Sequence, residues 1–95
     1  MKESTLQNER RALGYRITEL RKKVMNPDTG KFISQEELGF RTGYAKKTIG
    51  EIERGNSNPT FETLMLISKE LNVTIRELFN FDLKDYVMLS RKDRS

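Results

Sequence analysis

Residues 34–59 constrain the fold of this chain more than any other stretch. Ser34, followed three positions later by Glu37, has the pattern of a capping box, which opens an α-helix. Gly43 then breaks the helical pattern, because glycine suits the left-handed backbone geometry found at helix C-termini. A second helical pattern follows and is closed by Gly55. The stretch therefore predicts two short helices joined at a glycine corner.

A further amphipathic helix is predicted before this pair, because apolar residues recur there at helical spacing. It is expected to end near Met25, since the proline at position 27 disfavours helical geometry in the residue before it. Its start is left open between Ser4 and Gly14, and residues 26–31 are predicted to form a loop. The apolar positions of this helix are Leu13, Ile17, Leu20 and Val24.

Two more helices are predicted after residue 59. Thr60 can cap a fourth helix, and Asn72 is its expected C-terminal cap. Thr74 with Glu77 repeats the capping-box pattern and opens a short fifth helix. The chain is therefore predicted to be all-α, with five helices joined by short links. The inner face of the fourth helix is Leu64, Ile67 and Leu71.

Composition removes several classes of function. Ninety-five residues suit one domain with a single small core. The chain has neither cysteine nor histidine, so thiol and imidazole catalysis and nearly every transition-metal site are not expected. No stretch approaches the roughly 18 apolar residues of a membrane span, and the N-terminus lacks the apolar core of a signal peptide. We therefore expect a cytoplasmic protein that is not an enzyme and has no cofactor, metal or membrane partner.

Charge points toward a polyanion. The formal net charge is +4, which modestly favours a nucleic-acid partner. Residues 38–50 contain Arg41, Lys46 and Lys47 and no acidic residue. The basic residues of the second helix of the pair are therefore close to the corner between the two helices.

This second helix has the features needed to lie in the major groove of DNA. Such a helix turns a polar side toward base edges while a core holds its other side. Ile49 and Ile52 are its inward positions. Lysine can donate to guanine, glutamate can accept from cytosine N4, and glycine permits close backbone approach. The alternative interpretation is ordinary solvated helix surface. The predicted base-contacting residues are Lys46, Lys47, Gly50 and Glu51.

Several motifs surround this helix at characteristic positions along residues 13–80. They are Leu13-Gly-Tyr-Arg-Ile17, Leu20-Arg21, Ser34-Gln-Glu-Glu-Leu38, Thr42-Gly43, Thr48-Ile49, Ile52-Glu-Arg-Gly55, Asn58-Pro-Thr60 and Leu71-Asn-Val-Thr-Ile-Arg-Glu-Leu78. With these motifs the chain resembles the phage-repressor and Cro-type helix-turn-helix family, often called Xre-like. The resemblance implies a five-helix, lambda-repressor-like DNA-binding domain over residues 13–80. Residues 1–12 are then an N-terminal extension or part of the first helix, and residues 81–95 are a tail, apolar then basic, that could serve dimerisation.

The resemblance also implies roles for individual residues. Arg21 and Glu53 match a buried, structural ion pair between the first helix and the groove helix. Gly39 stands where the family usually has alanine, and the loop that contains Lys31 is longer than usual. Either Lys31 reaches a DNA phosphate or the loop is ordinary surface. Tyr44 would pack inward with its hydroxyl at the DNA backbone, or be a simple core aromatic. The phosphate-contacting residues implied are Gln35, Tyr44, Thr48, Asn56, Ser57 and Asn58.

The favoured function is a sequence-specific DNA-binding transcriptional regulator, most simply a repressor. One groove helix reads few base pairs, so we expect a homodimer on an inverted repeat of double-stranded DNA. Surplus apolar residues after the family domain provide the expected dimer interface: Phe79, Phe81, Leu83, Tyr86, Val87 and Met88.

Two alternatives stay open at this point. An antitoxin would bind a protein toxin as well as DNA, although the polar residues 1–12 offer little for a toxin to bind. A controller of a restriction-modification operon is equally compatible with so small a chain. An enzyme is a remote third possibility, because no nucleophile or base is evident.

Overall fold

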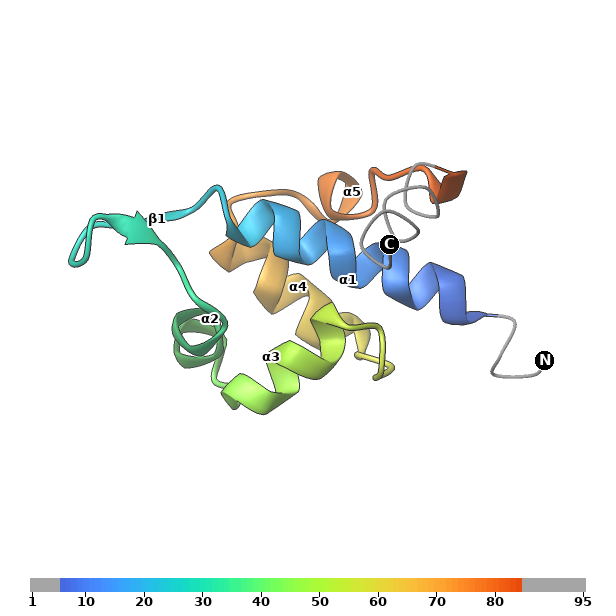
Figure 1. Ribbon diagram of the computed structural model, residues 1–95, viewed down its shortest axis with the longest axis horizontal. Helices are drawn as coiled ribbons and strands as arrows, with labels where there is room; N and C mark the ends of the chain where they lie inside the picture. The colour runs from blue at the N-terminus through green and yellow to red at the C-terminus, as the bar shows by residue number, and fades with distance from the viewer. Residues whose placement is uncertain (1–5, 85–95) are drawn as a thin grey trace, which may run out of the picture.

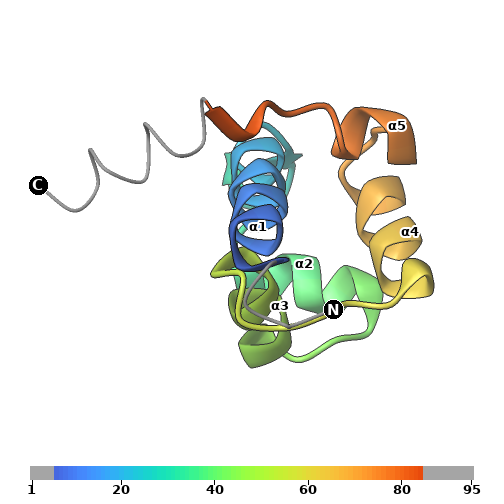
Figure 2. The ribbon, with the colours of Figure 1, turned by 90° about the vertical axis from the view of Figure 1, so that its right-hand side faces the viewer.

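The computed structural model describes residues 6–84, in which five helices and one short hairpin surround a single core. The helices are α1 (Gln7–Arg21), α2 (Gln35–Thr42), α3 (Lys46–Glu53), α4 (Phe61–Glu70) and α5 (Ile75–Leu78), and the hairpin strands are β1 (Met25–Asn26) and β2 (Lys31–Phe32). In both ribbon views α2 and α3 lie together on one side of the molecule, with α5 on the opposite side (Figures 1 and 2).

Every helix contributes a fully buried side chain to the core. In α1, α3 and α4 the buried side chain is at a position that the helical periodicity assigned to the inner face. In α2 and α5 the fully buried residues are Leu38 and Leu78, one in each helix, so no periodic pattern marks them. Burying each one contributes about 1.5–3 kcal/mol, so the five helices stabilise one another through a common centre. The five residues are Ile17, Leu38, Ile49, Ile67 and Leu78.

The caps of α4 and α5 confirm their prediction. The Thr60 hydroxyl accepts from the backbone N–H of Thr63 at 3.1 Å, and Thr74 with Glu77 forms a complete capping box. Asn72 has a φ of 59° just after α4, the left-handed geometry expected beyond a helix end.

The predicted capping box of α2 forms only in part. Ser34 accepts from the N–H of Glu37 at 3.0 Å. The Glu37 carboxylate, however, accepts from Arg41 one turn further along at 2.9 Å instead of returning to Ser34. A charged partner four residues away on the helix surface competes with the neutral backbone N–H that would complete the box.

The segment after α1 corrects two predictions. Helix α1 ends at Arg21 rather than near Met25, and residues 25–32 form a hairpin rather than a plain loop. Asn26 explains the turn: its side chain accepts from the N–H of Asp28 at 2.9 Å, and its carbonyl accepts from the N–H of Gly30 at 2.9 Å. Gly30 has a φ of 72°, which returns the chain toward β2. Two-residue strands are too short to show an alternating pattern in the sequence.

Helix α1 also begins earlier than the family motif. It starts at Gln7, so residues 7–12 belong to the helix rather than to a separate extension. The side chain of Gln7 donates to the carbonyl of Gly55 at 3.3 Å, and Ala12 is buried. These first turns therefore pack against the end of α3. None of the helices in residues 6–84 has the length and apolar character needed to cross a membrane.

The corner between α2 and α3 has the predicted glycine geometry. Gly43 has a φ of 87°, and its N–H and that of Tyr44 both donate to the carbonyl of Gly39, at 2.8 and 2.9 Å. A Cβ on Gly39 would lie 2.5 Å from the carbonyl oxygen of Tyr44. Glycine at position 39 therefore lets the chain fold back tightly over α2, which explains the departure from the family's alanine.

Helices α1 and α3 approach each other at Gly14. A methyl group there would overlap the backbone carbonyl oxygens of Ile52 and Glu53. Because these are backbone atoms of a packed helix, they cannot move aside as a flexible side chain would.

We therefore predict that Gly14→Ala lowers the free energy of unfolding by about 2 kcal/mol or more, as expected for overpacking against backbone. Urea denaturation followed by circular dichroism measures the change. Asn8→Ala, at an exposed position of the same helix, is the matched control and is expected to stay within about 0.5 kcal/mol of wild type. An unchanged unfolding midpoint for Gly14→Ala would contradict this account of the α1–α3 contact.

Candidate nucleic-acid interface

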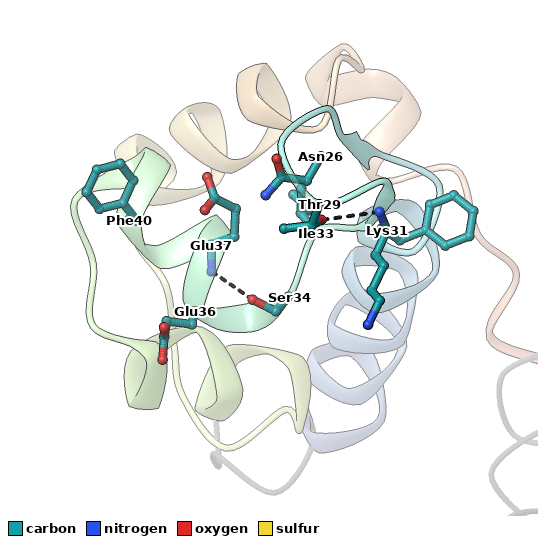
Figure 3. A pocket seen from close by; sticks show the side chains of 9 residues that line it. Asn26, Thr29, Lys31, Ile33, Ser34, Glu36, Glu37 and Phe40 are labelled. Atoms are coloured by element: carbon teal, nitrogen blue, oxygen red, sulfur yellow. Dashed lines mark hydrogen bonds between the residues drawn. The ribbon is translucent and has the colours of Figure 1, made fainter.

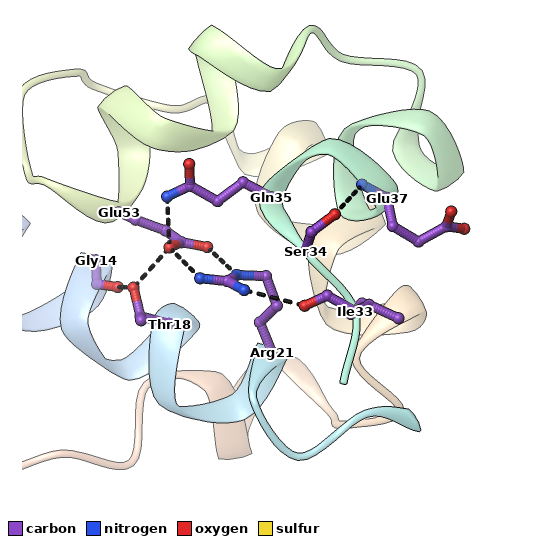
Figure 4. Close-up of polar contacts among 8 residues, drawn as sticks. All are labelled: Gly14, Thr18, Arg21, Ile33, Ser34, Gln35, Glu37 and Glu53. Carbon is purple, nitrogen blue, oxygen red and sulfur yellow. Dashed lines mark hydrogen bonds and ion pairs between the residues drawn. The ribbon is translucent and has the colours of Figure 1, made fainter. Parts of the chain in front are cut away.

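A buried carboxylate joins α3 to two other parts of the fold. Arg21 and Glu53, the residues predicted to pair, are linked by two hydrogen bonds, from Nε to Oε2 at 2.7 Å and from Nη2 to Oε1 at 3.0 Å. Their side chains are 11% and 4% exposed. The guanidinium also donates through Nη1 to the carbonyl of Ile33 at 3.0 Å. Figure 4 shows the Arg21 side chain between Glu53 and the segment that leads into α2.

Two further donors complete the shell of Glu53. The hydroxyl of Thr18 donates to Oε1 at 2.8 Å, and the Nε2 amide of Gln35 donates to the same oxygen at 3.0 Å. A buried charge is tolerated only when its lone pairs are satisfied, and here four hydrogen bonds from α1 and α2 reach one carboxylate (Figure 4). This network fixes the rotation of α3 about its own axis.

That rotation decides which side of α3 faces solvent. Ile49 and Ile52 are buried on the same side of the helix as Glu53, while Lys46, Lys47 and Thr48 are exposed. The first turn of α3 contains no acidic residue. Its backbone N–H groups and the two lysines therefore make this end of the helix attractive to anions.

Glu51 lies on the exposed side with a cation beside it. Arg54 Nη2 donates to Glu51 Oε1 at 3.0 Å. This hydrogen bond lowers the pKa of Glu51 below its ordinary value, and the side chain of Asn56 and the charge of Lys47 act in the same direction. The carboxylate is therefore ionised near neutral pH and is available only as an acceptor.

Gly50 was predicted to face bases and to let the backbone approach them closely. It is buried rather than open to a base, because the side chains of Arg54 and Gln35 cover it. A Cβ on Gly50 would lie 3.1 Å from Arg54 Nη1 and 3.4 Å from Gln35 Oε1. The interpretation of Gly50 as a point of close backbone approach to bases is therefore not supported by this arrangement; the glycine instead leaves room for two side chains.

The residues expected at the DNA backbone fall into two groups. Gln35 and Tyr44 have their polar groups engaged within the fold, Gln35 on Glu53 and the Tyr44 hydroxyl 2.9 Å from the Thr63 hydroxyl. Tyr44 also packs against the core, which favours the core-aromatic interpretation. The second group is the exposed Thr48, Asn56 and Asn58, together with the half-buried Ser57, whose hydroxyl oxygen is itself buried and has no hydrogen-bond partner within residues 6–84.

Comparison with known proteins agrees with this geometry. The helix-turn-helix family model matches residues 33–78, which cover α2 to α5. An uncharacterised HTH-type transcriptional regulator of Archaeoglobus fulgidus is 36% identical over 50 residues, which are 53% of this chain and 70% of that protein. The chain belongs to the Xre/Cro-like helix-turn-helix family of transcriptional regulators.

Two solved structures extend the comparison to the whole fold. The restriction-modification controller protein C.AhdI from Aeromonas hydrophila is 31% identical, with a TM-score of 0.62 over 74% of this chain and 96% of that one. The clp gene regulator ClgR from Corynebacterium glutamicum has a TM-score of 0.67 at 19% identity over 90% of this chain and 83% of that one, and shows the fold alone. In this helix-turn-helix protein, α2 and α3 are the two helices of the motif.

The residues expected at a dimer interface lie only partly within the described range. Phe79 and Leu83 are 46% and 36% exposed. Phe81 is half-buried and packs against the core, with its ring centroid 6.3 Å from that of Phe79. Tyr86, Val87 and Met88 lie outside the described residues.

The hairpin places Lys31 in a mixed environment. Lys31 lines a groove between the hairpin and α2 together with Phe32, Glu36 and Phe40 (Figure 3). Glu37 lines the same groove, and two carboxylates make it a poor site for a phosphate. This favours the interpretation of the hairpin as surface rather than as a DNA contact. Within residues 6–84, no acidic cluster is placed to hold a metal ion.

Two members of the site, Thr18 and Arg54, were not predicted from the sequence, and a third, Gln35, was predicted in another role. Thr18 lies one turn before Arg21 on α1, so both face Glu53, but threonine in a helix gives no signal of such a role. Gln35 was assigned to phosphate and instead binds Glu53. Arg54 was assigned no role at all. Only its position three residues after Glu51, a spacing at which helix side chains meet, could have identified it.

We predict that Arg21→Met lowers the free energy of unfolding by about 3–5 kcal/mol, because it leaves the Glu53 carboxylate buried without its cation. Thermal and urea denaturation measure the loss. Arg41→Ala removes an equal charge from the half-exposed pair with Glu37 and is expected to cost about 0.5 kcal/mol or less. Equal small losses in both variants would show that the Arg21–Glu53 pair is not a structural strut.

Proposed function

We propose that this helix-turn-helix regulator binds a specific double-stranded DNA operator through α3. The observation that carries the proposal is the pairing of an exposed basic end on α3 with a buried network that fixes its rotation. A helix held in one rotation presents the same side chains to the groove on every encounter, which base reading requires. We propose a cytoplasmic, non-enzymatic protein whose action is occupancy of DNA.

Three residues are proposed to read bases. Lys46 and Lys47 can donate to guanine O6 and N7, and Glu51 can accept from cytosine N4. Thr48 and the loop residues Asn56 and Asn58 are proposed to contact phosphates through their side chains; Ser57, whose hydroxyl oxygen is buried, is proposed to do so only through its backbone. The side chain of Gln35 is bound to Glu53, so we propose that Gln35 contacts a phosphate through its backbone N–H. The first N–H groups of a helix have no intrahelical partner and can bind an anion.

We propose further that the regulator acts as a homodimer. One eight-residue helix reads too few base pairs for useful specificity, whereas a dimer reads two half-sites about one helical turn apart. The exposed apolar side chains at the end of α5 support an interface there, with Phe79 and Leu83 at its described part. Phe81 would support the interface from beneath, because it packs on the core.

The direction of regulation follows from where the operator lies. Repression by covering a promoter is the simplest action of a DNA-binding domain of this kind. Control of a restriction-modification operon is the second candidate, supported by the 31% identity to the controller C.AhdI over 96% of that chain. An antitoxin role is not favoured by any feature of residues 6–84.

We predict that Lys47→Ala weakens operator binding by about 1–3 kcal/mol and relaxes the preference at one base position per half-site. Selection of bound DNA from a random pool, followed by titration of the selected site, measures both effects. Lys69→Ala removes the same charge from an exposed position on α4 and should leave the preference unchanged. An unchanged preference in Lys47→Ala would remove it from the base-reading set, and a pool without enrichment for wild type would overturn the proposed function.

A second prediction concerns the dimer. Leu83→Asp places a charge in the proposed interface and should weaken self-association by at least about tenfold, since an unpaired charge is costly to bury. Sedimentation over a range of concentrations measures the change. Phe40→Asp, at an 83% exposed phenylalanine of α2, is the control and should associate as wild type does. If Leu83→Asp dimerises normally, the interface lies elsewhere.

A further inference from the structure

Arg54 holds a defined position although it has no assigned role. It is the C-terminal cap residue of α3, and its guanidinium folds back along the helix. Nη2 donates to Glu51 Oε1 at 3.0 Å. Nη1 and Nη2 lie 3.1 and 3.3 Å from the point where a Cβ of residue 50 would stand. The guanidinium therefore lies over Gly50, at the surface of α3, with the Arg54 side chain 56% exposed.

The missing side chain of Gly50 makes this position possible. Gln35 Oε1 borders the same space, 3.4 Å from the Cβ position, and Gln35 Nε2 is bound to Glu53. The guanidinium of Arg54 and the side-chain oxygen of Gln35 therefore border the same space above Gly50. Gln35 belongs to the network around Glu53, so the Arg54–Glu51 pair lies beside that network.

The pairing of Arg54 with Glu51 reduces the repulsion between the Glu51 carboxylate and DNA. A carboxylate brought against DNA is repelled by the phosphates, and a flexible glutamate loses side-chain entropy when a base immobilises it. Arg54 supplies a cation in contact with the carboxylate, and Lys47 adds a second charge nearby. An ionised carboxylate has about four acceptor sites, so Oε1 can accept from Arg54 while the group still accepts from a cytosine amine.

We propose that Arg54 is a positioning residue for base reading: it holds the carboxylate of Glu51, ionised and oriented, on the groove-facing side of α3. The inference rests on the proposed function of α3 and adds a residue to it. Arg54 acts through Glu51, and Gly50 leaves the space beside the guanidinium open, since a Cβ there would lie 3.1 Å from Nη1 and the guanidinium would have to shift. The specificity of α3 at one base pair therefore depends on three residues together, Gly50, Glu51 and Arg54.

The test is a double-mutant comparison of DNA preference. Glu51→Ala defines the base pair that Glu51 reads in a random-pool selection. Arg54→Ala should lose on the order of tenfold in preference at that same base pair. Arg54→Ala in the Glu51→Ala background should lose nothing more, because its action has no carboxylate left to position. Arg41→Ala, which removes an equal charge from a similar pair on α2, is the matched control and should select the wild-type sequence.

A measurement without DNA tests the same contact. Proton titration by NMR should place the pKa of the Glu51 carboxyl below its ordinary value in wild type and return it toward that value in Arg54→Ala. Gly50→Ala should have the same two effects while keeping its stability, since alanine favours a helix and the displaced atoms belong to a flexible side chain. Arg54→Lys keeps the positive charge, so it should keep part of the base-pair preference and part of the lowering of the Glu51 pKa that Arg54→Ala loses.

The outcomes separate this inference from the proposed function. If wild type enriches a site but Arg54→Ala keeps the full preference, or weakens all sequences equally with a smaller salt dependence, Arg54 is not a positioning residue. The second pattern would make it a phosphate contact instead. An unchanged Glu51 pKa in Arg54→Ala also overturns the inference. If wild type enriches no sequence, the proposed function fails and this inference fails with it.

Discussion

The carboxylate of Glu53 is the constraint on which the rest of this structure depends. Helix α3 has eight residues and no side-chain cap at its N-terminus, and so short a helix is marginal in water by itself. Its order comes from packing of Ile49 and Ile52 and from the hydrogen bonds that Arg21 and Gln35 make to Glu53. Without these contacts neither the existence nor the rotation of α3 is secured.

The same contacts connect the buried side of α3 to its exposed side. Gln35 binds Glu53 with one end of its amide and borders Gly50 with the other. Arg54 covers Gly50 from outside and holds Glu51. A structural ion pair and a candidate base-reading side chain are therefore separated by little more than one glycine and two side chains. The proposed recognition side of α3 is thus in contact with the network that holds the helix in place.

Much of the fold could be predicted because its signals act over short distances. Caps at Thr60 and Thr74 and the glycine corner at Gly43 are local interactions, and all three are present. The hairpin at 25–32 was missed because two-residue strands carry no periodic pattern. The capping box at Ser34 formed only in part because a nearby arginine competed for Glu37. The candidate site was predicted less completely, since Thr18 reaches Glu53 from 35 residues away.

The sequence by itself determined the presence of five helices, the caps at Thr60 and Thr74 and the corner between α2 and α3, because periodicity and capping involve residues three or four positions apart. It also determined the family resemblance, which the relatives confirm. Only the tertiary structure decided that Gly50 is covered, that Gln35 binds Glu53 and that Arg54 lies against Glu51. The bond from Gln35 to Glu53 depends on how α2 packs against α3, and the separation of 18 residues along the chain carries no information about that contact. Arg54 and Glu51 have a spacing at which helix side chains can meet, but that spacing alone does not decide that the guanidinium lies over Gly50.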